Sequence, residues 1–170
     1  MTPELLEVGR GLAFAGAGLA FGLAGCGSAW GIAIASHQAA GVMREKPELF
    51  GRMLVMIALP GTQGFYGFIA AILMMTQTGL IGGSSLKISL GTGIALFFVG
   101  LCDGLAQLIS AKFQGEASAA GIALVGRRPE EAGKAILFPA FVETYAVVAL
   151  LATILFIIFL TQPMAYQPVP

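Results

Sequence analysis

Charged residues are scarce in this sequence. They make up 11% of its 170 residues, whereas 57% are hydrophobic, and a soluble domain normally carries about a quarter charged residues. So apolar a composition excludes an ordinary soluble domain and indicates a membrane protein. Nine basic and nine acidic residues give a net charge of zero, so no excess of positive charge points to a nucleic-acid partner.

Other features are missing as well. The sequence has no GxxxxGK[ST] loop for nucleotide phosphates, so we expect no ATP hydrolysis on this chain. The N-terminal segment MTPELLEVGR is acidic ahead of its apolar run, which is the wrong sign for a secretory signal. The two cysteines, Cys26 and Cys102, lie in apolar stretches, where we expect small buried side chains.

Long uncharged stretches are what the sequence has instead. No charge occurs in residues 11–43 or 53–86, and Glu143 is the only charged residue after Lys134. About 20 apolar residues cross a bilayer as a helix, so we predict an all-α membrane protein of four transmembrane helices. The predicted spans are about residues 12–42, 53–76, 88–125 and 135–160.

The chain also repeats itself. The tripeptide Ala-Ala-Gly precedes both charged loops at an offset of 80 residues, and the same offset separates Gln63 from Glu143. We therefore predict two tandem helical hairpins, residues 1–80 and 81–170. Parallel repeats of this kind are common in membrane transport proteins.

Basic residues gather in two short loops, residues 44–52 and 127–134, which hold six of the nine. The opposite side has only Lys87 between spans. Because basic residues near span ends favour the cytoplasm, we predict a multi-pass cell-membrane protein with cytoplasmic loops and both termini outside.

Glycines are concentrated in the first predicted helix. The pairs Gly18/Gly22 and Gly27/Gly31 have the four-residue spacing that lets helix backbones approach closely. Two interpretations remain open: a tight dimer or packed bundle, or the crowded inner wall of a ring made from many copies.

Glu143 is the most informative residue because it lies inside an otherwise uncharged span. A carboxyl group there is costly unless it is paired or protonated, and such residues are functional by default. The alternative is a neutral glutamic acid hydrogen-bonded between helices. Pro139, four residues earlier, removes a backbone donor and loosens the helix.

The second helix has a matching polar segment, LPGTQGFY. Thr62, Gln63 and Tyr66 share one helical face, and the repeat places them at the depth of Glu143. With Glu143 and with Gln114 of the third helix, this segment gives an anion, two amide oxygens and a hydroxyl, and Tyr66 can donate to the carboxylate. Hard cations are held by oxygen ligands of this kind. This favours a small cation, and we predict Na⁺. The alternative is that Thr62 and Gln63 only hydrogen-bond to neighbouring helices.

Two segments carry a resemblance to a known family. LPGTQGFYGF and FVETYAVV, together with FQGEASAAGIALVGRRPEEAGKAI, closely resemble the proteolipid, or K subunit, of bacterial V-type Na⁺-ATPases over about residues 10–160. The resemblance implies a ring of several copies in membrane lipid, attached to central stalk subunits. It also implies a stator subunit whose arginine competes for the carboxylate.

The resemblance further implies a set of ion-binding residues and one Na⁺ in each subunit, since Gln63 occupies the place equivalent to Glu143. Tyr66 would donate a hydrogen bond to the carboxylate. The implied Na⁺ ligands are the Leu59 backbone carbonyl and the side chains of Thr62, Gln63, Gln114 and Glu143.

Asp103, in the third helix, departs from the family pattern, and we expect an inner-wall or water-facing polar residue there. Lys112 and Glu116 are four residues apart and are expected to pair. Two alternative functions remain: a rotor of the same type that carries H⁺, and a small four-helix membrane enzyme or exporter.

Overall fold

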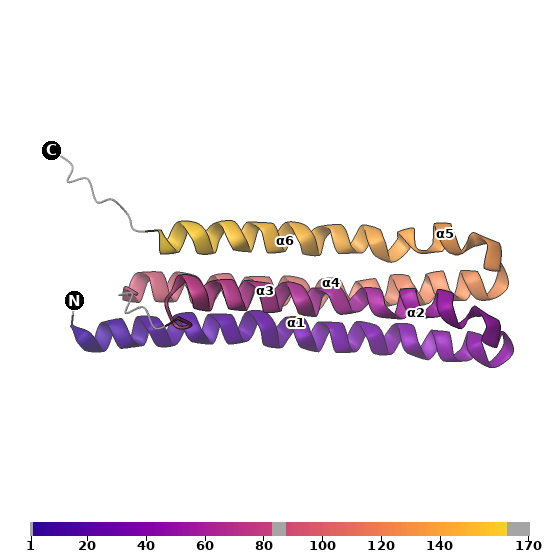
Figure 1. The fold of residues 1–170 in the computed structure, drawn as a ribbon, viewed down its shortest axis with the longest axis horizontal. Coiled ribbons are helices and arrows are strands. Elements are labelled where there is room, and N and C mark those ends of the chain that lie inside the picture. Colours follow the sequence, from indigo (N-terminus) through magenta and orange to yellow (C-terminus); the bar gives the residue numbers. More distant parts are fainter. Residues whose placement is uncertain (1, 83–87, 163–170) are drawn as a thin grey trace.

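The computed structural model describes residues 2–82 and 88–162. Lys87, which we predicted to lie between two spans on the side opposite the basic loops, is outside the described residues. Four long helical segments run alongside one another in this part of the chain (Figure 1). The first is the helix α1 (Pro3–Glu45). The second is composed of η1 (Pro47–Leu49), α2 (Phe50–Ala58), η2 (Leu59–Gly61) and α3 (Thr62–Gln77).

The third segment is α4 (Leu90–Arg127), and the fourth contains η3 (Pro129–Glu131), α5 (Ala132–Ala135) and α6 (Leu137–Thr161). All four segments are long and apolar enough to cross a membrane. The predicted all-α, four-span fold is therefore confirmed.

Prolines explain why the second and fourth segments are interrupted. A proline lacks the N–H that would bond to the carbonyl four residues earlier. Pro60 lies in the short 3₁₀ turn η2, directly ahead of α3. In the fourth segment the break between α5 and α6 falls at Ile136, next to Ala135, whose carbonyl would otherwise accept from Pro139. Both interruptions lie close to the polar residues singled out in the sequence.

Glycines on α1 let its backbone approach that of α4. A Cβ atom at Gly16 would lie 2.6 Å from the Leu96 carbonyl oxygen, and one at Gly27 or Gly31 would also collide with α4. The pair Gly27/Gly31 therefore serves packing within the bundle. Gly18 and Gly22 differ, because a Cβ at either position meets nothing within 4 Å.

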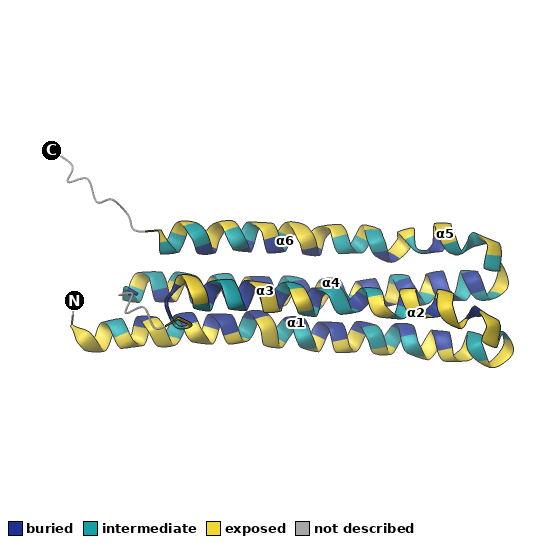
Figure 2. Ribbon diagram, viewed as in Figure 1, coloured by how far each residue is buried: buried dark blue, intermediate teal, exposed yellow. Residues whose placement is uncertain are grey.

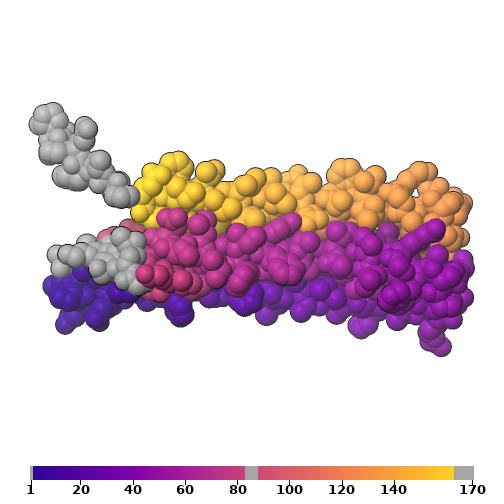
Figure 3. Space-filling model, in the orientation of Figure 1, coloured from indigo at the N-terminus to yellow at the C-terminus, as the bar shows by residue number. Residues whose placement is uncertain are grey.

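Helices α3 and α6 complete the bundle. α3 packs against α1 and α4, and α6 packs against α4 and α3. Exposed residues recur along the whole length of every segment (Figure 2), and the space-filling view shows the same elongated shape (Figure 3). Large exposed side chains include Phe65, Phe141 and Phe159. A surface this apolar suits lipid or a neighbouring protein.

The expectation that both cysteines are buried is wrong. Cys26 and Cys102 are exposed on the bundle surface. In a membrane protein, apolar residues on the outer face contact lipid or another subunit rather than the chain's own interior. An apolar sequence context therefore does not indicate burial.

The two charged loops lie together at one end of the bundle, opposite the start of α1 and the end of α6 (Figure 1). Lys46 Nζ donates a hydrogen bond to the Gly126 carbonyl at 2.7 Å, and Arg52 Nη1 donates to the Pro129 carbonyl. Two basic side chains of the first loop thus hold the second loop in place.

Candidate ion-binding site

Thr62 begins α3 immediately after the turn that contains Pro60. Its hydroxyl donates to the Leu59 carbonyl at 3.0 Å and lies 3.3 Å from Gln63 Oε1. The proline-induced turn thus brings a backbone carbonyl, a hydroxyl and an amide oxygen together at one point of the second segment.

Gln63 and Gln114 join the two hairpins in the centre of the bundle. Both side chains are fully buried, and Gln63 Nε2 donates to Gln114 Oε1 and to Ser110 Oγ. Gln114 Nε2 donates in turn to the Pro139 carbonyl at 3.2 Å and to Glu143 Oε2 at 3.3 Å. A continuous hydrogen-bonded path therefore leads from α3 through α4 to the carboxyl group on α6.

Glu143 receives a second hydrogen bond from the other hairpin. The Tyr66 hydroxyl donates to Glu143 Oε1 at 2.7 Å, so each carboxyl oxygen has one protein donor. The salt bridges in residues 2–82 and 88–162 are Lys112–Glu116 and Lys134–Glu131. Glu143 thus has hydrogen-bond donors but takes part in neither of these ion pairs.

The structure brings together all six residues that the resemblance implied, namely Leu59, Thr62, Gln63, Tyr66, Gln114 and Glu143. The predicted Lys112–Glu116 pair is also confirmed, at 3.0 Å.

Sequence reasoning missed several contributors to this site. Ser110 accepts from Gln63 and contacts the Val142 carbonyl, and Ser28 Oγ accepts from the Gly64 N–H at 2.8 Å. A signal was present on α4, since polar residues recur there at alternating spacings of four and three. Such spacing marks one helical face. The residues of this polar face are Asp103, Gln107, Ser110 and Gln114.

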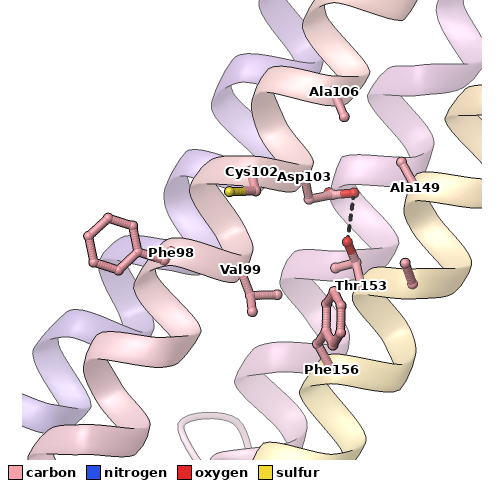
Figure 4. A pocket seen from close by; sticks show the side chains of 9 residues that line it. Phe98, Val99, Cys102, Asp103, Ala106, Ala149, Thr153 and Phe156 are labelled. Atoms are coloured by element: carbon pink, nitrogen blue, oxygen red, sulfur yellow. Dashed lines mark hydrogen bonds between the residues drawn. The ribbon is translucent and has the colours of Figure 1, made fainter.

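The expectation that Asp103 faces water is wrong. Its side chain is only 2% exposed and points from α4 toward α6 (Figure 4). Gln107 Nε2 and Thr153 Oγ1 both donate to Asp103 Oδ1 at 3.2 Å. Alternating polar spacing on α4 places Asp103 on the face that α6 covers, which explains its burial.

The six-residue site contains the kinds of oxygen atom that coordinate a small hard cation. A carboxylate, two amide oxygens, a hydroxyl and a backbone carbonyl are linked within one network, and hard cations are held by oxygen ligands of these kinds. The carboxylate supplies the negative charge that balances a monovalent ion. The amide oxygens are buried where water cannot compete for them.

Four apolar helices in two repeated hairpins, with a carboxyl group in the fourth, define a multi-pass membrane protein with a partly buried polar site between its helices. The chain belongs to the ATP synthase C-subunit family, whose model matches residues 15–74 and again residues 97–156. The double match confirms that the hairpin is duplicated.

Two individual proteins are similar to this chain over most of its length. The chain is 35% identical to the V-type sodium ATPase subunit K of Enterococcus hirae, over 93% of this chain and 99% of that protein. It is 41% identical to the A-type ATP synthase subunit K of Methanocaldococcus jannaschii, over 84% of this chain and 60% of that protein. These matches confirm the resemblance found in the sequence, and they give no support to an unrelated membrane enzyme or exporter.

Proposed function

We propose that this chain is the rotor subunit of a V-type ATPase and that it carries Na⁺ across the membrane on Glu143. The observation that carries the proposal is the connected set of oxygen donors around a membrane-embedded carboxylate. The match over nearly the full length of a V-type sodium ATPase subunit K supports the same ion.

In this proposal the ion is bound by the Leu59 carbonyl and by the side chains of Thr62, Gln63, Gln114 and Glu143. Tyr66 orients the carboxylate through its hydrogen bond to Oε1. Na⁺ neutralises the charge of Glu143, and a neutral site costs far less free energy to move past lipid than a bare carboxylate does. Neutralisation is therefore the step that permits rotation.

Release requires a competing positive charge. We propose that an arginine of a stator membrane subunit approaches Glu143 and displaces the ion. No basic residue of this chain is paired with Glu143 in the described residues, which leaves the carboxylate available to such a partner. ATP would be hydrolysed on other subunits, and central stalk subunits would transmit the rotation, so this chain would be a non-catalytic part of the enzyme.

The surface fits a ring of identical copies surrounded by lipid. Gly18 and Gly22 leave open space along α1, where the backbone of a neighbouring copy could approach closely. Phenylalanines exposed on α3 and α6, such as Phe65 and Phe159, suit lipid. Basic side chains in both loops favour a cytoplasmic position for the loops and an external one for the termini.

The direct test is Na⁺ transport by the complete enzyme in sealed vesicles, with Glu143→Gln compared with Glu116→Gln. Glu116 is a partly exposed carboxylate paired with Lys112, so its variant controls for the loss of a carboxyl group from the chain. We expect Glu143→Gln to assemble and to abolish transport, whereas Glu116→Gln pumps normally. Retained Na⁺ pumping by Glu143→Gln would refute the proposal.

H⁺ is the second candidate for the carried ion. A proton rotor would need only the carboxyl group and its surroundings. The Leu59 carbonyl, the Thr62 hydroxyl and the Gln63 amide oxygen would then have no role in binding the carried ion. ATP-driven transport that does not respond to Na⁺ at neutral pH would favour H⁺.

A further inference from the structure

A second buried polar cluster lies between α4 and α6, apart from the Glu143 site. It contains Asp103, Gln107 and Thr153, none more than 5% exposed. Thr153 is ten residues beyond Glu143 on α6, which corresponds to about 15 Å along the helix axis. The cluster is therefore displaced from Glu143 toward the C-terminal end of α6.

Two oxygen atoms of this cluster have no partner. Asp103 Oδ2 and Gln107 Oε1 are two of the three buried side-chain polar atoms without a hydrogen bond in the described residues. The orientation of the Gln107 amide is fixed by its surroundings, since Nε2 lies between two acceptors, Asp103 Oδ1 and the Ala146 carbonyl at 3.1 Å. Turning the amide over would place an oxygen against both of them.

The charge of Asp103 also lacks a counterpart. Its hydrogen-bond partners, Gln107 and Thr153, are neutral. The next basic residue along α4 is Lys112, nine residues away or about 14 Å, and neither α3 nor α6 contains a basic residue. On α1, Leu19 and Leu23 lie against Gly104, and Arg10, the nearest Lys or Arg on that helix, is nine residues before Leu19, again about 14 Å. A buried carboxylate without a paired charge is strongly unfavourable. Both the charge and the unpartnered oxygens therefore point to a bound cation.

We propose that Asp103, Gln107 and Thr153 form a second binding site for one monovalent cation, either H⁺ or Na⁺, in each copy of this chain. Na⁺ would be coordinated by the two unpartnered oxygens, whereas H⁺ would reside on Asp103 Oδ2. In both cases the carboxyl group is neutralised where it lies, by a cation taken from solution.

A cavity lies beside this site. A cavity of about 360 Å³ between α4 and α6 is lined by apolar side chains such as Phe98 and Phe156 and by the polar pair Asp103 and Thr153 (Figure 4). Asp103 and Thr153 thus border this cavity, whose wall is otherwise mainly apolar.

The cluster occurs once per chain. At the repeat offset of 80, the residues equivalent to Asp103, Gln107 and Thr153 are Leu23, Gly27 and Leu73. The first hairpin therefore has no equivalent polar group, and the proposal adds one cation site to each chain.

The sequence allows a specific test, because Asp103 is its only aspartate. The purified chain in detergent would be made with aspartate isotope-labelled at its side-chain carboxyl carbon, and its infrared spectrum recorded at a pH where exposed carboxyls are ionised. An isotope-sensitive carboxylic-acid band means that Asp103 holds H⁺. This measurement needs no variant that might misfold.

The Na⁺ form is tested by counting radiolabelled Na⁺ bound to the Glu143→Gln protein. One Na⁺ per chain that disappears in Glu143→Gln/Asp103→Asn means that Asp103 binds Na⁺. In that case Thr153→Val should weaken binding about tenfold, since it removes a hydrogen bond to a charged group, whereas Thr153→Ser should retain it.

The absence of both the acid band and the bound Na⁺ would overturn the proposal, since Asp103 would then be an ionised carboxylate with no cation. The result does not depend on the function of Glu143, because Na⁺ is counted with Glu143 already replaced. Failure of Glu143 as the transport residue would leave these two readouts unchanged.

Discussion

The Tyr66 hydroxyl and the Glu143 carboxylate are 2.7 Å apart, although the two residues belong to different hairpins. This hydrogen bond crosses from α3 to α6 and restrains Glu143, the one charged side chain of α6. In the proposed mechanism it holds the carboxylate toward the other ligands when the site is occupied, and it must be released when the ion leaves.

Replacing Tyr66 with phenylalanine should weaken Na⁺ binding. A hydrogen bond to a charged group contributes about 1.5–3 kcal/mol, so we expect the Na⁺ concentration for half-maximal ATPase activity to rise about tenfold or more. Tyr145→Phe is the matched control, because Tyr145 lies two residues from Glu143 but is 79% exposed. An equal shift in both variants would contradict the assigned role of Tyr66.

Substitutions at Thr62 test whether its hydroxyl oxygen is a Na⁺ ligand. Thr62→Val keeps the branched shape but removes the oxygen, whereas Thr62→Ser keeps the oxygen and removes a methyl group. We expect bound Na⁺, measured by equilibrium dialysis, to decrease strongly in the valine variant and to change little in the serine variant. The same Na⁺ affinity in both would show that the hydroxyl only caps the turn through Leu59.

Two glycine substitutions separate bundle packing from ring assembly. A Cβ at Gly100 would collide with the backbone of Gly16, whereas a Cβ at Gly18 meets nothing within the chain. We therefore expect Gly100→Leu to prevent stable folding of the hairpin pair. Gly18→Leu should fold but fail to form rings, as judged by native mass measurement. Rings of normal mass from Gly18→Leu would show that this face of α1 is not a contact between copies.

Gln63 contributes both an oxygen ligand and a hydrogen-bond donor, so its replacement should affect stability as well as binding. Gln63→Leu leaves the buried Gln114 Oε1 without its donor, which costs about 1–3 kcal/mol. We expect a lower midpoint of thermal unfolding in detergent and loss of the protection that Na⁺ gives against unfolding. Undiminished stabilisation by Na⁺ would exclude Gln63 as a ligand.

The sequence was sufficient to predict the four membrane spans, because few features other than a bilayer explain such long uncharged stretches. It was also sufficient to single out Glu143, since a carboxyl group is conspicuous where no other charge occurs. The roles of Ser110 and of the Pro139 carbonyl were harder to foresee. A serine in a membrane helix is common, and a backbone carbonyl has no sequence signature.

Asp103 shows why the burial of other side chains could not be predicted from the sequence. Its position on α4 was clear from the sequence, but whether that face meets water or α6 depends on the rotation of one helix against another. Close α1–α4 packing through Gly16 and Gly100 fixes that rotation and turns Asp103 inward. The cysteines were misjudged for a related reason, since hydrophobic surroundings in sequence did not reveal which helical face would be outermost.

Carbodiimide labelling of Glu143 shows whether Na⁺ binds to this carboxylate, because the reagent reacts with a protonated, accessible carboxyl group. Purified rings would be labelled across a range of pH with and without millimolar Na⁺, and the modified peptide identified by mass. We expect strong protection by Na⁺ that weakens as the pH falls, because Na⁺ and H⁺ compete for one carboxylate. Labelling of Glu143 at the same rate with and without Na⁺ would contradict this expectation.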